Sequence, residues 1–409
     1  GVGGHSYYNL QDFYNTSFQL AYDHYLGNHE LHIGYKWELG EEDLVRYSNG
    51  WGYVDMPLGK TTEDGTTIAY EANIFQASLN GLGEDAIDPH HSEMKSQSIE
   101  LNDVWRMNDW TFNLGLVLSN DKLYGSGLRP NSSNPSGFEL APGNQYMMKE
   151  IGWDEMVSPR LGATWSPNGR DAVYASWARY YPSVSSLPRA ASWDRNLALR
   201  QIDVQFDAEG NLIGQDPLRA SSGKLFQEGI DPRSMDEYVI GYDKQMSSAW
   251  TGRVHLRHRQ ARDFWEDTQN NARSRFEAPE GYPQEDYIPD LGTYEEIGVS
   301  QGSYVIAQLD HAFTRYYEVS TEAEWRGRNA FFRGSYVWSH YYGNYDQDGT
   351  NMVGDADIYI GSSYLADGGG RQLWNFHEGN LRGDRRHMLK LYGFYQLPWN
   401  GTVGAYGIY

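Results

Sequence analysis

Residues 344–355 carry oxygen-bearing side chains at the spacing of a calcium-binding loop. Positions 1, 3, 5, 7 and 12 of such a loop, with glycine at position 6, match Asn344, Asp346, Asp348, Thr350 and Asp355. The match is imperfect, because Asn replaces Asp at the first position and the shorter Asp replaces Glu at the last. A calcium ion would fix a long loop in a chain that has no cysteine. The alternative is an ion-free turn, since Asn, Asp and Gly dominate turns in general.

A second group of charged side chains alternates along two segments. Residues 250–260 place four cationic side chains on one strand face, and residues 313–325 place acidic ones on theirs: Arg253, His255, Arg257 and Arg259, and Glu318, Glu322 and Glu324. On neighbouring strands these opposite charges would pair across a water-filled lumen. An ion-pair ladder that merely satisfies a polar interior is the interpretation we favour. A surface that guides a charged solute or docks another protein segment is the alternative.

Aromatic and histidine side chains supply further candidates. Five rings could stack on sugar rings or peptide side chains of an external ligand, although we favour a packing role for them: Tyr341, Tyr342, Tyr345, Trp374 and Phe376. His90, His91 and Glu93 could bind a transition metal, but we expect them to be solvated in an acidic loop.

Motifs for enzyme chemistry are missing from the sequence. His255 and His258 would point to opposite faces of a strand, so they do not form a metal pair. The sequence holds no GxSxG motif and no glycine-rich loop followed by Lys and Ser or Thr. We therefore predict that the chain is not an enzyme.

The elements that carry these residues are predicted to be β-hairpins. Apolar and polar residues alternate over 18–39, 110–118 and 157–181, and short turns such as Gly27-Asn28 interrupt the alternation. Further turns are expected near residues 246–249, 326–329 and 398–401. The six hairpins predict about twelve strands, which together would form an antiparallel sheet.

The connections between these hairpins are long. They cover roughly residues 40–94, 121–156, 182–235, 265–312 and 343–384, all rich in Gly, Asp, Asn, Pro and Ser. Residues 67–80 could form another strand, but we place them within the first outer loop to keep the inside-outside order. Short turns on one side and long loops on the other are typical of outer-membrane β-barrels. The predicted fold class is therefore all-β, a transmembrane antiparallel barrel with short periplasmic turns and long extracellular loops.

The amino-acid composition agrees with strands that face lipid on one side and water on the other. Aromatic residues make up 15% of the chain while the mean hydropathy is −0.69, a pairing expected where alternate residues face lipid and the loops are wet. A formal net charge of −22 argues against nucleic acid as a partner. A soluble propeller or sandwich is the competing fold, but propeller blades repeat at a near-constant spacing and these hairpins do not.

Two stretches carry a family resemblance. Residues 157–184 (VSPRLGATWSPNGRDAVYASWARYYPSV) and 344–399, which include GRQLWNFHEGNLRGDRRHMLKLYGFYQLPW, resemble the barrel of TonB-dependent receptors of the Oar-like type. The resemblance extends over most of the chain. It implies a barrel of roughly 22 strands filled by an N-terminal plug domain, with a TonB box that couples import to the inner membrane.

The resemblance also sets expectations about the whole protein. We find no plug and no TonB box in the sequence, and twelve strands alone would leave two unpaired edges in lipid. We therefore expect residues 1–409 to be part of one barrel domain in a longer protein, about twelve of roughly 22 strands, although Tyr409 could also end a barrel. The expected partners are outer-membrane lipid, the plug, the TonB system and an unidentified solute.

The leading functional hypothesis is a receptor of the bacterial outer membrane that binds an external solute for TonB-energised import. One alternative is a surface or assembly protein whose loops bind a partner without transport. The other is a secreted, soluble β-rich enzyme that acts on glycans. A requirement for detergent would separate the enzyme from both membrane hypotheses, because an apolar belt cannot stay dispersed in water.

Overall fold

The computed structural model describes residues 7–48, 52–78, 90–130, 138–182, 199–215, 224–226, 229–269, 304–308, 311–345, 360–361, 378–381 and 383–409. These residues form strands and turns, and they contain no helix long and apolar enough to cross a membrane. The strands are β1 (Tyr7–Leu26), β2 (His29–Ser48), β3 (Gly52–Asp55), β4 (Tyr70–Ser78), β5 (His90–Met107), β6 (Trp110–Pro130), β7 (Phe138–Ile151), β8 (Val157–Trp165), β9 (Ala172–Tyr180), β10 (Leu199–Phe206), β11 (Leu212–Gln215), β12 (Lys224–Phe226), β13 (Ser234–Gln245), β14 (Trp250–Arg262), β15 (Trp265–Gln269), β16 (Tyr304–Gln308), β17 (Thr314–Arg326), β18 (Ala330–Gly343), β19 (Ile360–Gly361), β20 (Gly379–Asn380), β21 (His387–Gln396) and β22 (Thr402–Ile408).

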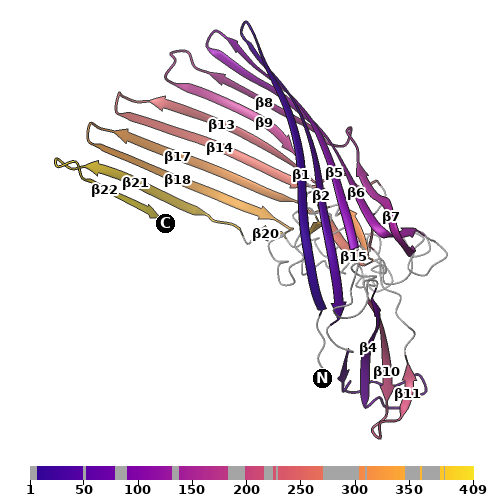
Figure 1. Cartoon of the computed structure of the whole chain (residues 1–409). Coiled ribbons are helices and arrows are strands. Elements are labelled where there is room, and N and C mark those ends of the chain that lie inside the picture. The colour runs from indigo at the N-terminus through magenta and orange to yellow at the C-terminus, as the bar shows by residue number, and fades with distance from the viewer. Residues whose placement is uncertain are drawn as a thin grey trace, which may run out of the picture.

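One large curved sheet dominates the structure (Figure 1). It has 14 strands, and its main path runs β1-β2-β5-β6-β8-β9-β13-β14-β17-β18-β21-β22, with β7 beside β6 and β20 beside β18. Every neighbouring pair along this path is antiparallel. The prediction of an all-β antiparallel fold is confirmed, and the twelve strands of the path match the predicted number. The barrel is not closed, because among the described strands β1 and β22 each have a neighbour on one side alone.

Short turns join the hairpins of the path at one end of the sheet. β1 and β2 are joined by Gly27 and Asn28, and β5 and β6 by Asn108 and Asp109. Gly27, Asn108 and Asn400 have φ angles of 60°, 53° and 65°, a left-handed backbone that Gly and Asn adopt most easily. The predicted turns are thus confirmed, since local backbone chemistry alone is enough to specify them.

Long connections leave the opposite end of the sheet, and parts of them form two small sheets (Figure 1). One has the order β11-β10-β4-β3 and the other β12-β16-β15-β19. β4 lies within the segment 67–80 and pairs with β3 and β10 rather than with the large sheet. The placement of that segment in the first outer loop is confirmed. The predicted contrast between short turns and long connections is also observed.

The predicted boundaries of the first two long loops were wrong. β2 runs on to Ser48 and β5 already starts at His90, so much of 40–94 belongs to the large sheet. β6 continues to Pro130, and β7 pairs with that extension. These extensions lack a clear apolar alternation, because Glu41, Asp43, His91 and Glu93 stand on the face that carries apolar residues nearer the short turns. They are held by backbone hydrogen bonds, which leave no periodic signal in the sequence.

The buried apolar core lies at the end of the sheet from which the long connections leave. Met94 of β5 and Leu123 of β6 are directly paired and point to the same face. Trp265, the first residue of β15, packs on that face together with Ile230, and all four side chains are almost fully buried. The connecting segments therefore fold against one face of the large sheet, which identifies this face as the interior.

Candidate functional site

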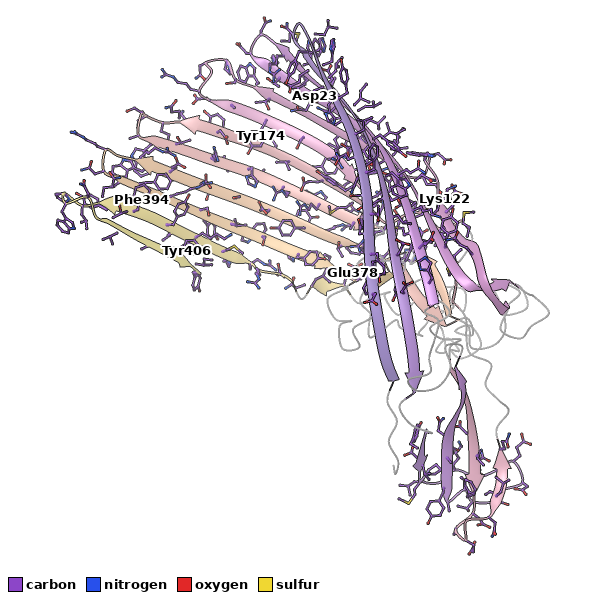
Figure 2. All side chains as sticks on the ribbon, viewed as in Figure 1. Asp23, Lys122, Tyr174, Glu378, Phe394 and Tyr406 are labelled. Carbon is purple, nitrogen blue, oxygen red and sulfur yellow. The ribbon has the colours of Figure 1, made fainter. Side chains whose placement is uncertain are left out.

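The large sheet separates its side chains onto two faces of different chemistry. Directly opposed residues of antiparallel strands point to the same side, so Ile240, Leu256 and Val319 form one row across β13, β14 and β17. Ile240 and Leu256 are 52% and 50% exposed, although both are aliphatic. Side chains leave both sides of the ribbon along its whole length (Figure 2). The side with Ile240 and Leu256, here called the apolar face, lies opposite the interior.

Aromatic side chains border the apolar face near the short turns. Trp110 and Trp165 are opposed across β6 and β8, and Trp250 and Trp325 across β14 and β17. Their ring centroids lie 6.2 and 6.5 Å apart. Phe332 of β18 continues this row, because it is opposed to Trp325 and its ring is 5.7 Å away.

A second aromatic row borders the apolar face on the side of the long connections. Tyr238, His258 and Tyr317 are consecutive cross-strand neighbours in β13, β14 and β17. The His258 ring stacks between the two tyrosines, 6.1 Å from Tyr238 and 4.7 Å from Tyr317. The two rows span nine residues of β14, from Trp250 to His258, which is the length of strand that crosses a bilayer core. The apolar face is therefore a band with an aromatic border on each side.

The interior face of the same strands carries the charged ladder expected from the sequence. His255 Nε2 lies 2.7 Å from Glu318 Oε1, and Arg257 Nη1 lies 3.3 Å from Glu318 Oε2. Tyr316 donates its hydroxyl hydrogen bond to Glu318 over 2.6 Å. The Glu318 side chain is only 9% exposed, so its charge depends on these three partners. Burying a carboxylate costs free energy unless such hydrogen bonds are present.

Other members of the ladder pair with different strands. Arg253 Nη1 lies 3.4 Å from Glu322 Oε1, and Glu322 also binds Arg333 of β18. Arg259 binds Glu237 of β13 instead of an acid on β17. Glu324 does not meet the cations of β14, because Thr251 stands opposite it. Its partner is Arg326 of the same strand, 2.9 Å away, which is a departure from the expected cross-strand pair.

Charges on this interior wall nearly cancel. Within the described part of β13, β14, β17 and β18, five guanidinium groups are matched by five carboxylates: Arg253, Arg257, Arg259, Arg326 and Arg333, and Glu237, Asp243, Glu318, Glu322 and Glu324. A balanced wall offers little net attraction for a solute of one sign. The geometry favours the structural ladder over a charge-selective surface.

A glycine makes room for a ring on the interior wall. Gly241 of β13 stands directly opposite Tyr174 of β9, and a Cβ atom at this glycine would lie 2.3 Å from the tyrosine ring. The ring therefore lies flat over the glycine and covers its backbone, an arrangement known to support glycines within sheets. Tyr174 is labelled in Figure 2.

The candidate calcium loop lies mostly outside the described residues. Asn344 is described: its side-chain oxygen accepts a 2.8 Å hydrogen bond from the Phe313 backbone, and its amide donates to the His311 carbonyl over 2.7 Å. In this arrangement Asn344 ties β18 to the start of β17. Asp346, Asp348, Thr350 and Asp355 are among the residues that are not described, so the calcium site stays a prediction.

The aromatic ligand candidates do not form one cluster. Tyr345 is 1% exposed and packs against Phe264, which is the packing role that the sequence analysis favoured. Tyr341 and Tyr342 are successive residues of β18 and point to opposite faces, and the Tyr342 hydroxyl donates to Glu378 over 2.8 Å. Trp374 and Phe376 lie outside the described part of the chain.

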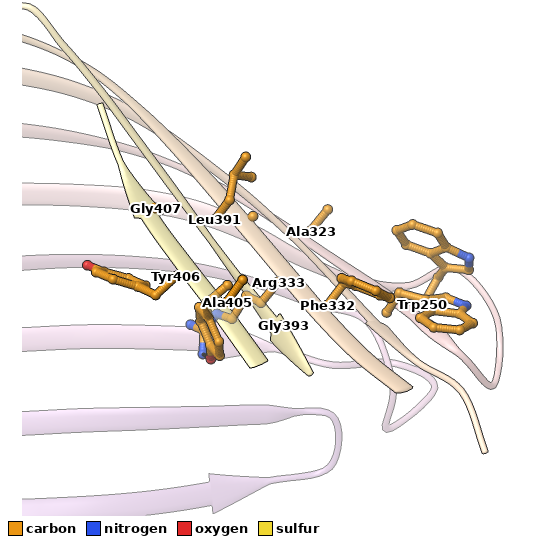
Figure 3. Close-up of a pocket in the computed structure, with 12 residues that line it drawn as sticks. Trp250, Ala323, Phe332, Arg333, Leu391, Gly393, Ala405, Tyr406 and Gly407 are labelled. Carbon is orange, nitrogen blue, oxygen red and sulfur yellow. Dashed lines mark hydrogen bonds between the residues drawn. The ribbon is translucent and has the colours of Figure 1, made fainter. Parts of the chain in front are cut away.

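A hollow of about 560 Å³ indents the sheet near β22 (Figure 3). The hollow lies where the strands carry small side chains or none, chiefly at Ala323, Gly334, Gly393 and Ala405. Trp250 of the aromatic row lines the same hollow. A Cβ atom at Gly393 would meet the Phe332 ring at 2.5 Å, so part of the missing volume is filled by that ring. Arg333 is the one charged residue among those that line the hollow, and its guanidinium group is paired with Glu322.

Sequence reasoning named His91 and Glu93 as possible metal ligands but missed Glu41. The prediction that His91 lies in a loop was wrong, because it belongs to β5 and stands beside Glu41 of β2. Within the described ranges, Glu41, His91 and Glu93 have ligand atoms within 4.8 Å of one another. Burial lowers the pKa of His91, but its hydrogen bonds to Asp43 and Glu93 outweigh this and raise it. Knowledge of the β2–β5 register would have been needed to find Glu41.

Comparisons with known proteins give structural likenesses alone. No family model and no curated protein matches the chain. Three similar solved structures are the siderophore receptor PiuA from Acinetobacter baumannii (11% identity, TM-score 0.49, 98% of this chain and 46% of that one), the outer membrane transporter YddB from Escherichia coli (11%, 0.46, 95% and 40%) and the alcaligin outer membrane receptor FauA from Bordetella pertussis (12%, 0.42, 99% and 55%). The chain thus spans about two fifths of the length of YddB.

Proposed function

We propose that this chain forms part of the wall of a bacterial outer-membrane β-barrel, in a receptor that binds an external solute for TonB-energised import. The observation that supports this most strongly is the sorting of side chains in the large sheet. One face is apolar and bordered by aromatic rows, and the other is charged and internally paired.

The apolar face would be unfavourable in water. Full burial of a Leu or Ile side chain contributes about 1.5–3 kcal/mol, and this face exposes a whole row of them, including Ile33, Leu101, Leu114, Leu161, Ile240 and Leu256. Contiguous apolar surfaces of this kind mark a membrane or protein interface. Lipid chains fit it best, because aromatic rows border it on both sides at the separation of the two bilayer interfaces.

The connections support an orientation. Outer-membrane barrels place their short turns in the periplasm and their long loops outside the cell. We place the turn after Leu26 and its counterparts in the periplasm, and the two small sheets outside. The acidic loops would then be the part of the wall that meets an external solute.

The receptor part of the proposal is supported by the sequence resemblance over residues 157–184 and 344–399. Under this proposal residues 1–409 belong to one barrel domain, and the small sheets are outward extensions of it. A plug would occupy the interior and contact the wall that carries Glu318 and Arg257. Because charges on that wall are already paired, the plug would dock mainly through hydrogen bonds and packing.

The unpaired edges of β1 and β22 support a wall larger than twelve strands. An edge strand in lipid leaves backbone N–H and C=O groups without partners, and each such group costs several kcal/mol. Further strands must therefore meet both edges, and a complete barrel of roughly 22 strands is what the resemblance implies.

The membrane half of the proposal can be tested by fractionation of cells that produce the complete protein. We expect the protein in the outer-membrane fraction, resistant to extraction with carbonate and released by detergent. Recovery in the soluble fraction without detergent would reject the membrane wall and favour the soluble enzyme.

The import half requires an uptake measurement. Cells with and without the complete protein would be given labelled peptide, oligosaccharide and ferric-chelate mixtures, with and without a protonophore that collapses the inner-membrane gradient. Protein-dependent uptake that the protonophore abolishes is the expected result. Binding without such uptake for all three mixtures would favour the surface or assembly role.

A further inference from the structure

Four side chains with metal-ligating atoms meet on two adjacent rungs of the β2–β5 ladder. Glu41 stands directly opposite Glu93, and Asp43 stands directly opposite His91. All four therefore point to the same face, the one that carries the apolar band further along the same strands. Tyr35 and Trp37 lie between these rungs and the band, so the group lies beyond the band on the side of the long connections.

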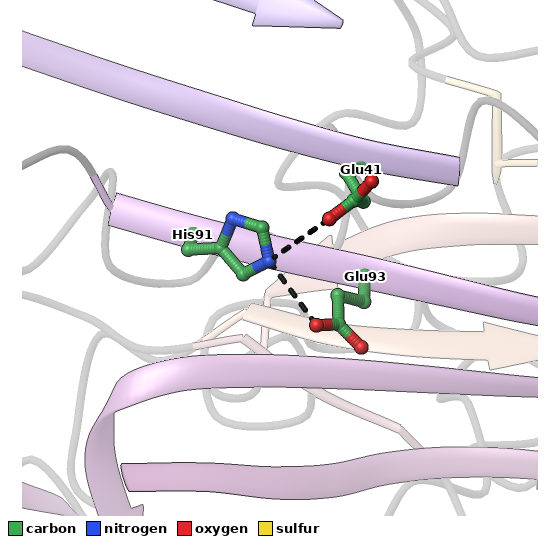
Figure 4. Close-up of side chains that lie close together, drawn as sticks. All are labelled: Glu41, His91 and Glu93. Carbon is green, nitrogen blue, oxygen red and sulfur yellow. Dashed lines mark hydrogen bonds and ion pairs between the residues drawn. The ribbon is translucent and has the colours of Figure 1, made fainter. Parts of the chain in front are cut away.

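Figure 4 shows the imidazole of His91 with its Nε2 atom directed between two carboxylates. Nε2 lies 3.2 Å from Glu93 Oε1 and 3.7 Å from Glu41 Oε1. These separations resemble the roughly 3.3–3.5 Å between ligand atoms of a tetrahedral zinc site, which follows from metal–ligand bonds of about 2.0–2.2 Å. A small divalent ion would need little movement of these side chains.

The other ring nitrogen is already held. His91 Nδ1 lies 2.6 Å from Asp43 Oδ1, the arrangement in which a carboxylate orients a metal-binding histidine and leaves its Nε2 lone pair for the ion. Glu93 is oriented in the same way, because Lys95 Nζ binds its Oε2 atom at 2.8 Å and leaves Oε1 directed at the imidazole. Both ligands are thus positioned by partners that would not themselves touch the metal.

The register adds an electrostatic reason for a cation. Two carboxylates directly opposed across a ladder destabilise a sheet, and here a third one, Asp43, follows two residues later. A divalent ion between Glu41 and Glu93 would convert this repulsion into coordination.

We propose that Glu41, His91 and Glu93 bind a divalent first-row transition metal of the zinc class, with a fourth position open to water or an external ligand. Imidazole with carboxylates suits zinc and its neighbours, whereas calcium requires six to eight oxygen ligands and seldom takes nitrogen. The site is separate from the charged interior wall and independent of the import proposal, because it lies on the outward face of the sheet.

The test uses cobalt as a spectroscopic probe on the complete protein in detergent. We expect one Co²⁺ per chain with the visible absorption of tetrahedral cobalt, displaced by an equimolar amount of Zn²⁺. The His91→Ala and Glu41→Gln variants should each weaken binding by at least tenfold, and Asp43→Asn by roughly tenfold through loss of orientation. His29→Ala is the matched control. Asp103 holds the Nδ1 atom of His29 at 2.7 Å, much as Asp43 holds that of His91 at 2.6 Å, but the described residues place no second carboxylate beside His29.

Three results would overturn the proposal. They are the absence of tetrahedral cobalt absorption in the unaltered protein, equal cobalt affinity in His91→Ala and the unaltered protein, and displacement of cobalt by equimolar Ca²⁺. Folding of each variant is checked by its far-ultraviolet circular dichroism. If His91→Ala does not fold, Glu41→Gln decides, since it keeps the shape of the side chain and removes one ligand charge.

Discussion

A charge placed on the apolar face should be far more costly than the same charge on the interior face. Leu161 lies on the apolar face of β8, a strand of 9 residues, and its side chain is 42% exposed. Asn113 lies on the neighbouring strand β6 and points to the interior face, one register position from the partner of Leu161. The variants Leu161→Arg and Asn113→Arg therefore introduce the same side chain at almost the same height on opposite faces.

The expected cost of Leu161→Arg follows from the depth of residue 161 in the bilayer. Leu161 is four residues from each end of β8, or about 13 Å along the strand at about 3.3 Å per residue. With a strand tilt near 45° this places it about 9 Å from each border of the band, close to the bilayer midplane. Arginine at that depth costs about 2–4 kcal/mol, which lowers the folding equilibrium constant roughly 30- to 900-fold. On a wet interior face the cost should stay below about 1 kcal/mol.

The assay is reversible guanidinium unfolding of the complete protein in phosphatidylcholine vesicles, followed by tryptophan fluorescence. We expect the free energy of unfolding to fall in Leu161→Arg and to change little in Asn113→Arg. An equal loss in both variants, or a larger loss in Asn113→Arg, would refute the assignment of the two faces.

Three further predictions concern the charged groups. Replacing Glu318 by Gln should lower the free energy of unfolding by about 1–3 kcal/mol, because His255 and Arg257 lose a buried charged acceptor. Glu324→Gln should lower it by less than about 1 kcal/mol, because its partner Arg326 is exposed. A larger loss in Glu324→Gln than in Glu318→Gln would contradict this prediction. Burial raises the pKa of Asp236, but its bonds to Arg179 at 2.9 and 3.0 Å and the nearby Arg262 outweigh this and hold the pKa below the usual value. The contribution of Asp236 to stability is therefore complete above the unfolded pKa of about 4 and is lost as the pH falls through the lower folded value. The acid unfolding curve of Asp236→Asn should lack this component, and a curve identical to that of the unaltered protein would contradict the prediction. Calcium should slow proteolysis within residues 344–355 if the predicted loop binds the ion, and cleavage that calcium leaves unchanged would reject the site.

The sequence predicted the part of the large sheet that carries the apolar face well. In strands such as β6 and β8 alternate side chains point to the apolar face and to the interior, so their apolar residues recur at every second position, and turns such as Gly27-Asn28 have their own backbone chemistry. The strand extensions of β2 and β5 gave no such signal, because polar residues such as Glu41 and His91 stand on the face that is apolar nearer the short turns. Strand pairs outside the band depend on backbone register, which residue types do not encode.

The sequence predicted some of the candidate sites and not others, for the same reason. The ladder around Glu318 could be anticipated because β14 and β17 belong to adjacent hairpins and carry opposite charges at alternate positions. Glu41 and His91 are far apart in the sequence, and they meet because β2 and β5 extend beyond the band in register. Arg259 pairs with Glu237 of β13 rather than with an acid of β17. Each inner strand has two neighbours, and the sequence does not indicate which of them carries the partner.

Lipid contact along β13 tests the central claim most directly. The chain has no cysteine, so single cysteines at residues 239, 240, 242 and 243 can each carry a spin label in the complete protein reconstituted in vesicles. We expect collisions with dissolved oxygen to be frequent at 240 and 242, and collisions with a water-soluble nickel complex to be frequent at 239 and 243, which point to the interior face. Equal accessibility at all four positions, or the opposite alternation, would contradict a sheet that separates lipid from a wet interior.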